Sequence, residues 1–186
     1  MAKNYLFIVL VFATFLIISA CEKDDPVIPV EPELITTLSY ILSPTGGGTA
    51  INLIFQDLDG DGGTAPTITG GTLATNQTYT GTLELLNETE SPAENITEEI
   101  EAEDDAHQFF FETTVANLSI TYTDQDDNGN PIGLKTNLTT GDVASGNISI
   151  ILRHEPDKSA NGVSNGDISN AGGETDIEVT FPINVQ

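Results

Sequence analysis

The first of two acidic loops has the spacing of side-chain oxygens that binds calcium. Asp57, Asp59 and Asp61 stand at alternate positions, and Gly62 follows them. Acids spaced in this way can converge on one Ca²⁺ ion, and glycine permits the sharp turn between them. A helix-flanked calcium loop carries a bidentate glutamate at its twelfth position, where this chain has Ile68. The pattern therefore predicts a Ca²⁺ site that takes a further ligand from elsewhere in the chain.

The second loop repeats the arrangement with Asp124, Asp126 and Asn128, followed by Gly129. Its twelfth position is Lys135, so it also departs from the helix-flanked motif. Each loop follows a predicted strand, and the two loops could meet at one end of the fold. Asp-Gly and Asn-Gly are also common hairpin-turn residues, because they tolerate positive φ. The sequence leaves both interpretations open, a pair of Ca²⁺ sites or two turns.

Two histidines are the remaining candidates for metal binding. His107 and His154 each share the parity of an alternating apolar run and stand at its end. We expect them to be rim residues of the core. The alternative is a metal site that both histidines build with Glu155 or Asp105.

No motif assembles a catalytic set. The segment Gly162–Gly166 fits the G-x-S-x-G pattern of hydrolases, but no histidine follows Ser164 and its surroundings are polar. Paired carboxylates could hydrolyse a glycan, yet no pair of acids is singled out by the sequence. We therefore predict a protein that is not an enzyme, with a glycan-active enzyme as the lesser alternative.

The elements that must position these residues are mainly strands. Apolar residues alternate with polar ones in run after run, which is the pattern of antiparallel strands with one buried face. Seven or eight such runs, separated by Gly, Asn and Asp turns, predict an all-β fold: an immunoglobulin-like antiparallel β-sandwich, or alternatively a small closed barrel. The apolar positions are Leu34, Leu38, Tyr40, Leu42, Ile51, Leu53, Phe55, Tyr79, Leu83, Leu85, Phe109, Phe111, Leu118, Ile120, Tyr122, Ile148, Ile150, Leu152, Ile177, Val179, Phe181, Ile183 and Val185.

Only residues 91–105 favour a helix, because they are rich in Glu and Ala and place Ile96 and Ile100 four residues apart. This segment is strongly acidic. Since like charges repel, we expect a solvated loop or surface helix, which could also dock a basic partner.

The first twenty residues have the features of a secretory signal peptide. Lys3 is followed by an apolar run from Tyr5 to Ile18, too short for a membrane-spanning helix. The segment Ile18–Cys21 resembles the lipobox of bacterial lipoproteins, and Cys21 is the only cysteine. The resemblance implies cleavage before Cys21, lipidation of its thiol and attachment of the protein to a membrane of the cell envelope.

A tether over residues 21–33 separates this anchor from a β-sandwich domain over residues 34–186. Prolines at positions 26, 29 and 32 have the period of polyproline II, which makes a semi-rigid spacer. Lys23, Asp24 and Asp25 resemble the export signal of surface-exposed gram-negative lipoproteins. The resemblance implies the outer membrane and exposure at the cell surface.

The charge of the chain limits its partners. The formal net charge is −24, from 29 acidic and 5 basic side chains. Such a field repels phosphate backbones and excludes nucleic acid as a partner. Cations, basic proteins and neutral glycans remain as possible partners.

Two stretches, Thr45–Ala50 and His107–Phe111, resemble sequences described as a type 1 periplasmic binding fold. That fold is α/β and two-lobed, whereas this chain lacks alternating helices, so neither its fold nor its ligand site is carried over. We predict instead a membrane-anchored envelope lipoprotein whose loops bind an unknown protein or glycan, with or without Ca²⁺. The alternative is a structural or accessory subunit of an outer-membrane assembly.

Overall fold

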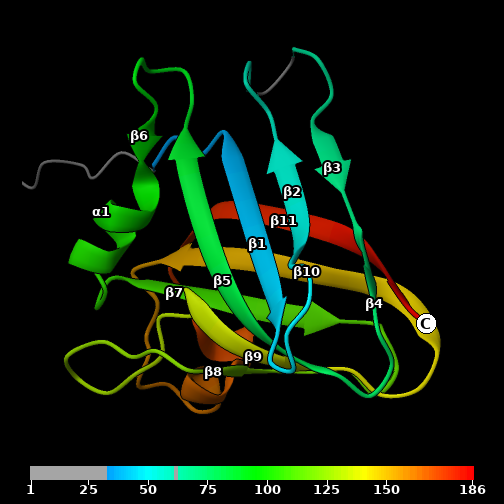
Figure 1. Cartoon of the computed structure of the whole chain (residues 1–186). Helices are drawn as coiled ribbons and strands as arrows, with labels where there is room; N and C mark the ends of the chain where they lie inside the picture. The colour runs from blue at the N-terminus through cyan, green and yellow to red at the C-terminus, as the bar shows by residue number, and fades with distance from the viewer. Residues whose placement is uncertain (1–32, 61–62) are drawn as a thin grey trace, which may run out of the picture. The chain divides into compact units, whose positions relative to one another are not determined.

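The computed structural model describes residues 33–60 and 63–186, which form two β-sheets around one main core (Figure 1). The predicted signal peptide, Cys21, most of the tether and Asp61 lie outside the described residues. In the part that the structure describes, no helix has the length and apolar character to cross a membrane.

The larger sheet has seven strands in the order β3-β2-β1-β5-β9-β8, with β6 paired to β5. All its pairs are antiparallel. Its strands are β1 (Thr37–Pro44), β2 (Ile51–Gln56), β3 (Thr67–Thr69), β5 (Thr78–Asn87), β6 (Glu94–Asn95), β8 (Ser119–Tyr122) and β9 (Lys135–Thr139).

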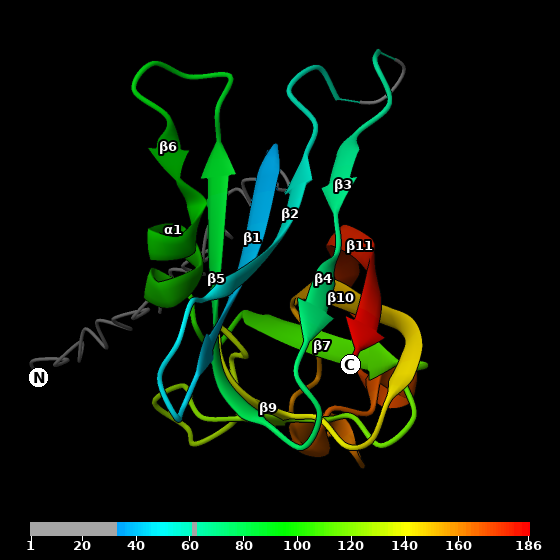
Figure 2. The same ribbon diagram turned by 45° about the vertical axis from the view of Figure 1, so that its right-hand side comes forward.

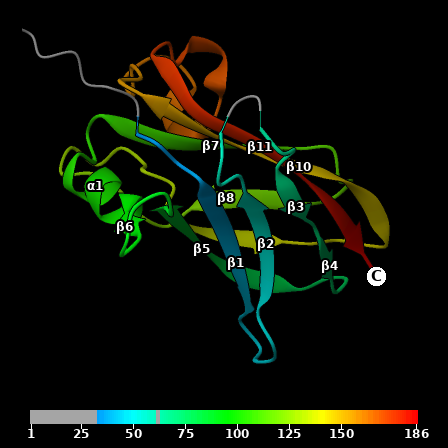
Figure 3. The ribbon, with the colours of Figure 1, turned by 90° about the horizontal axis from the view of Figure 1, so that it is seen from above.

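The smaller sheet has four strands in the order β4-β11-β10-β7. Its pairs are antiparallel except for β4 and β11, which run parallel along Gly71–Leu73 (Figure 2). The strands are β4 (Gly71–Leu73), β7 (His107–Thr113), β10 (Ala144–His154) and β11 (Glu174–Val185). Seen from above, β7, β10 and β11 lie together on one side of β1, β2 and β5 (Figure 3).

The core lies between the two sheets, as the alternation predicts. Tyr40 on β1 and Phe181 on β11 are both fully buried, and the same cluster includes apolar residues of most strands. The Tyr40 hydroxyl lies 2.6 Å from the Thr136 hydroxyl, so its polar atom is satisfied within the core. Leu34 departs from the prediction with 54% of its surface exposed, because the first strand begins only at Thr37.

The all-β sandwich is therefore confirmed. Eight of the described strands have four or more residues, which agrees with the predicted count. Each sheet ends in two edge strands, so the closed alternative is excluded. The strand order differs from that of immunoglobulin domains, in which sheets of four and three strands face each other.

The predicted helix forms over Ile96–Ala102 (α1), and Ile96 and Ile100 are its buried residues. A second small cluster covers the outer face of the smaller sheet. There Phe110 and Ile151 pack under two 3₁₀ turns, η1 (Val163–Asn165) and η2 (Ile168–Asn170). Phe110, which strict alternation would expose, is buried by this loop.

Candidate functional site

Two paired strands bring the histidines face to face. His107 on β7 and His154 on β10 are direct partners in the antiparallel register. Side chains at such positions project to the same face of a sheet and touch. The two ring centroids lie 4.7 Å apart, with the rings inclined by 52°.

A β-bulge adds an acid to this pair. Leu152 pairs with Ile177 and Arg153 pairs with Thr175, so Asp176 is the extra residue between them. A bulge interrupts the strand's alternation and can redirect a side chain. Asp176, which the alternating pattern places on the wet face, has a side chain only 1% exposed, and its Oδ1 lies 3.8 Å from Nδ1 of His154.

The second acid comes from the segment before β1. Glu33 lies four residues ahead of Thr37, and its side chain is 8% exposed. Its Oε1 is 3.1 Å from Nε2 of His107, and its Oε2 is 3.9 Å from Nδ1 of His154. Glu33 thus connects the chain leading into the larger sheet with two strands of the smaller sheet. We call Glu33, His107, His154 and Asp176 the histidine–carboxylate cluster.

Hydrogen bonds define the state of His107. Its Nδ1 lies 3.0 Å from the carbonyl oxygen of Glu103, which can only accept, so Nδ1 carries a proton. Nε2 therefore faces Glu33 either with a second proton or with a free electron pair.

The surroundings shift three pKa values in the cluster. The hydrogen bond from His107 lowers the pKa of Glu33, against the opposing effect of burial. Burial alone would lower the pKa of His107, but its hydrogen bonds to Glu33 and to the Glu103 carbonyl outweigh burial and leave it raised. Burial, with the nearby Glu33 charge, raises the pKa of Asp176 to about 6.

One oxygen of each acid lacks a hydrogen bond although it is buried. These are Oε2 of Glu33 and Oδ2 of Asp176. One ligand atom from each of the four residues lies within 4.8 Å of all the others, so the cluster can hold a metal ion chemically.

The sequence identified the two histidines but paired them with the wrong acids. Glu155 and Asp105 are exposed and are not members of the cluster. The actual acids were not visible in the sequence because Glu33 fell within the predicted tether and Asp176 needs the bulge. No signal in the sequence singled out Asp176, because an acid at that position fits the alternation of the run Glu174–Val185.

In the first acidic loop, the acids stabilise turns. Oδ1 of Asp57 accepts a hydrogen bond from the Gly60 N–H at 3.0 Å, and Oδ2 of Asp59 accepts one from the Thr64 N–H at 2.8 Å. The hydrogen bond from Thr64 lowers the pKa of Asp59. With Asp61 outside the described residues, Ca²⁺ at this loop stays a prediction.

In the second acidic loop, both aspartates have partners on both oxygens. Asp124 accepts from the backbone N–H groups of Gly133 and Lys135. Oδ1 of Asp126 accepts from the backbone N–H groups of Asn128 and Asn130, and Oδ2 lies 3.1 Å from the buried Lys158 ammonium. The side chain of Asn128 lies in the exposed part of this turn.

The two acidic loops do not meet. The first follows β2, next to one edge of the larger sheet, and the second follows β8, which is the opposite edge strand. Figure 1 shows them well apart. Strands β1, β5 and β9 lie between β2 and β8 in the larger sheet, so the two loops do not form one joint site.

A separate cleft opens beside helix α1. Strand β9 pairs with β5 only as far as Thr82, after which Leu83 N–H donates to the Leu134 carbonyl. Thr97 of α1 then satisfies the edge of β5, since its hydroxyl accepts from Leu85 N–H at 2.8 Å. The divergence of β9 from β5 leaves an open cleft of about 440 Å³ between the helix and the two strands.

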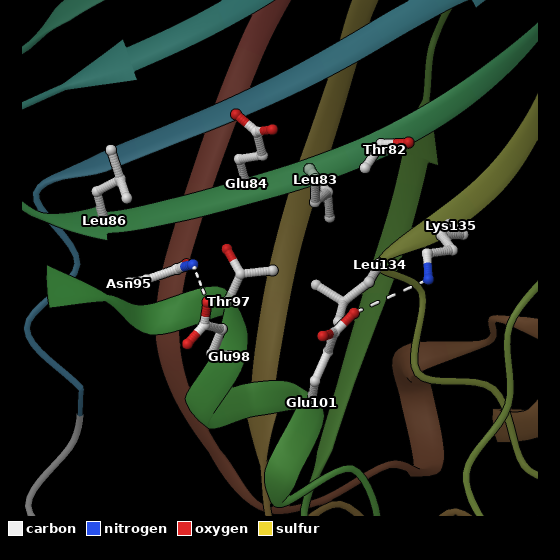
Figure 4. A pocket seen from close by; sticks show the side chains of 10 residues that line it. All are labelled: Thr82, Leu83, Glu84, Leu86, Asn95, Thr97, Glu98, Glu101, Leu134 and Lys135. Atoms are coloured by element: carbon white, nitrogen blue, oxygen red, sulfur yellow. Dashed lines mark hydrogen bonds and ion pairs between the residues drawn. The ribbon is translucent and has the colours of Figure 1, made fainter.

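The cleft combines an aliphatic floor with acidic walls (Figure 4). Glu101 extends from the helix toward Lys135, and Glu98 of the helix accepts a hydrogen bond from the Asn95 amide at 2.9 Å. Glu84 projects from β5 on the side away from the helix. Lys135 is the basic residue of the lining and lies 3.9 Å from Glu101 in an exposed pair. We call this feature the helix cleft.

No protein-family model matches the chain, and no curated protein matches its sequence. Among solved structures, the chain is similar to "Crystal structure of the S-layer protein SbsC domains 4 and 5". The match has 15% sequence identity and a TM-score of 0.26, and it covers 78% of this chain and 75% of the other. A likeness this weak carries no argument about fold or function.

Proposed function

We propose that this protein is a lipid-anchored protein of the bacterial cell envelope whose β-sandwich binds a basic protein partner at the helix cleft. The lipobox-like segment ending in Cys21 and the proline-spaced tether support the anchor. Lys23, Asp24 and Asp25 support export to the outer membrane and exposure at the surface. In this proposal the domain binds its partner without catalysing a reaction.

The observation that carries the binding role is the composition of the helix cleft. Three glutamates and one lysine line an opening whose floor is the half-buried Leu86, above the buried Leu83 and Leu134. Lysine and arginine side chains combine an aliphatic stem with a cationic head. The stem fits the leucine floor, and the head fits the glutamates on the walls.

The charge of the whole chain favours the same partner. A net charge of −24 attracts basic proteins over long distances and accelerates their encounter. Long-range attraction alone, however, does not direct the partner to one position on the surface. The helix cleft supplies a specific position, because it is concave and holds acids on a helix anchored by Ile96 and Ile100.

The test measures binding of a fluorescent lysine-rich peptide to the full chain purified in detergent. Replacing Glu98→Gln and Glu101→Gln should weaken binding roughly two- to thirtyfold, because each exposed ion pair contributes about 0.2–1 kcal/mol. The matched control is Glu112→Gln with Glu178→Gln, which removes two exposed acids from the other sheet. If both double variants weaken binding equally, net charge alone attracts the peptide and the cleft has no role.

A further inference from the structure

We propose that the histidine–carboxylate cluster is a binding site for one divalent transition-metal ion of the zinc type. This site is independent of the helix cleft and of the acidic loops. It is built from Glu33, His107, His154 and Asp176, which come from four separate segments of the chain.

The ligand set suits such an ion. Two imidazole nitrogens and two carboxylate oxygens are zinc ligands, bound at about 2.0–2.2 Å in a tetrahedron. Ligand atoms of that tetrahedron are roughly 3.3 Å apart, which follows from the bond lengths. Glu33 Oε1 lies 3.1 Å from Nε2 of His107, and Nδ1 of His154 lies 3.8 Å from Asp176 Oδ1 and 3.9 Å from Glu33 Oε2. One ligand atom from each of the four residues lies within 4.8 Å of the others. Small side-chain movements would therefore bring all four into the coordination sphere.

The outer contacts of His107 are those of a metal ligand. A histidine that binds metal usually donates its second ring N–H to a carbonyl or carboxylate, which fixes the tautomer and the ring orientation. The Nδ1–H of His107 donates to the Glu103 carbonyl at 3.0 Å. This contact leaves Nε2 directed at the interior of the cluster, where a metal ion would take the place of the second proton.

The two buried carboxylates of the cluster also favour a bound cation. Glu33 and Asp176 each bury an oxygen without a hydrogen-bond partner. Such oxygens are costly unless something positive lies against them. A divalent ion neutralises both carboxylates while both imidazoles stay neutral. Calcium would not fit as well, because it takes six to eight oxygen ligands.

An ion can reach the site from the side of His154. That side chain is 12% exposed, whereas His107 is fully buried.

The alternative occupant of the site is a proton, with His107 charged and paired to Glu33. The two cases differ in whether the protein retains zinc.

The test uses the full chain purified in detergent, from which bound metal has been removed with EDTA. This protein is titrated with ZnCl₂ in an isothermal calorimeter, with Ca²⁺ present in excess. We expect one zinc ion per chain. Loss of an outer-shell contact typically costs about 10–100-fold in metal affinity. Losing a ligand should cost at least as much, so His154→Gln and Asp176→Asn should each weaken zinc binding by about 100-fold or more.

Controls separate lost ligands from lost folding. Glu155→Gln and Asp105→Asn remove exposed acids next to the same histidines and should leave zinc affinity unchanged. Circular dichroism in EDTA should show the same β-sheet signal for His154→Gln as for the wild type. Folded His154→Gln that binds zinc as tightly as the wild type would overturn the proposal, as would a wild-type chain that takes up no zinc.

Discussion

His107 and His154 face each other across β7 and β10, with ring centroids 4.7 Å apart. The strand register fixes this distance, because the two residues are direct partners in the last pair of the ladder. The bulge beside His154 then places Asp176 at the same end of the sheet. Backbone pairing thus positions His107, His154 and Asp176, and the segment before β1 brings Glu33 to them.

The buried pair of Asp126 and Lys158 should stabilise the fold. Lys158 contacts the Asp126 carboxylate at 3.1 Å and also donates to the Asp104 carbonyl. Removing one partner of a buried pair leaves the other charge uncompensated. We expect Asp126→Asn to lower the free energy of unfolding by about 3 kcal/mol at pH 7. Urea denaturation measures this, and the exposed neighbour Asp127→Asn is the matched control.

The same pair should give the protein an acid-sensitive stability. Burial alone would raise the pKa of Asp126, but the Asn130 N–H and the Lys158 ammonium hold it below its ordinary value. The stabilisation is therefore present above about pH 4 and is lost as the pH falls through the lowered pKa. The difference in unfolding free energy between the wild type and Asp126→Asn should shrink as the pH falls below about 4. A difference that stays constant over this range would contradict the assigned role.

The helix that walls the cleft depends on its two isoleucines. Ile100 is fully buried in the main core. Truncating such a side chain costs about 2–5 kcal/mol, so Ile100→Ala should destabilise the domain by that amount in urea denaturation. It should also weaken binding of the lysine-rich peptide, because Glu98 and Glu101 lose their support. Glu99→Ala, on the exposed side of the helix, should leave stability nearly unchanged.

The anchor can be tested in cells. Wild-type protein should incorporate radiolabelled palmitate and remain with the outer membrane after fractionation. Cys21→Ser removes the thiol to which lipid would be attached, so the label should be absent and the protein should leave the membrane fraction. Label in the Cys21→Ser variant would place the lipid elsewhere.

Calcium at the first acidic loop is tested by thermal unfolding of the full chain in detergent. Ligand at 100 times its dissociation constant stabilises a fold by about 2.7 kcal/mol. We expect Ca²⁺ to raise the melting temperature by roughly 5–10 °C. The double variant Asp57→Asn with Asp59→Asn should lose this rise. An equal rise with magnesium, or none, would leave these aspartates as turn residues.

The sequence predicted the elements well and the cluster poorly, for physical reasons. Alternation has a direct cause in strand geometry, so the buried face of β11 and the helix around Ile96 and Ile100 were predictable. The pairing partner of His154 depends on long-range register, which a single sequence does not contain. The burial of Asp176 depends on one extra residue in a strand, and a bulge reverses the parity on which the prediction rests.

The role of Glu33 could not be predicted for a related reason. It follows a run of prolines and carries a charge, both typical of an exposed tether. Only the packing of the segment before β1 against the smaller sheet brings it to His107. Phe110 shows the same dependence on packing, since a loop more than fifty residues later covers it.

The most direct test of the metal site is anomalous X-ray diffraction from crystals of the full chain grown with zinc, recorded on both sides of the zinc absorption edge. The cluster predicts a single strong anomalous peak bonded to Glu33, His107, His154 and Asp176, at about 2.0–2.2 Å from each ligand atom. Density for the four side chains without an anomalous peak among them would show that a proton, and not a metal ion, holds the cluster together.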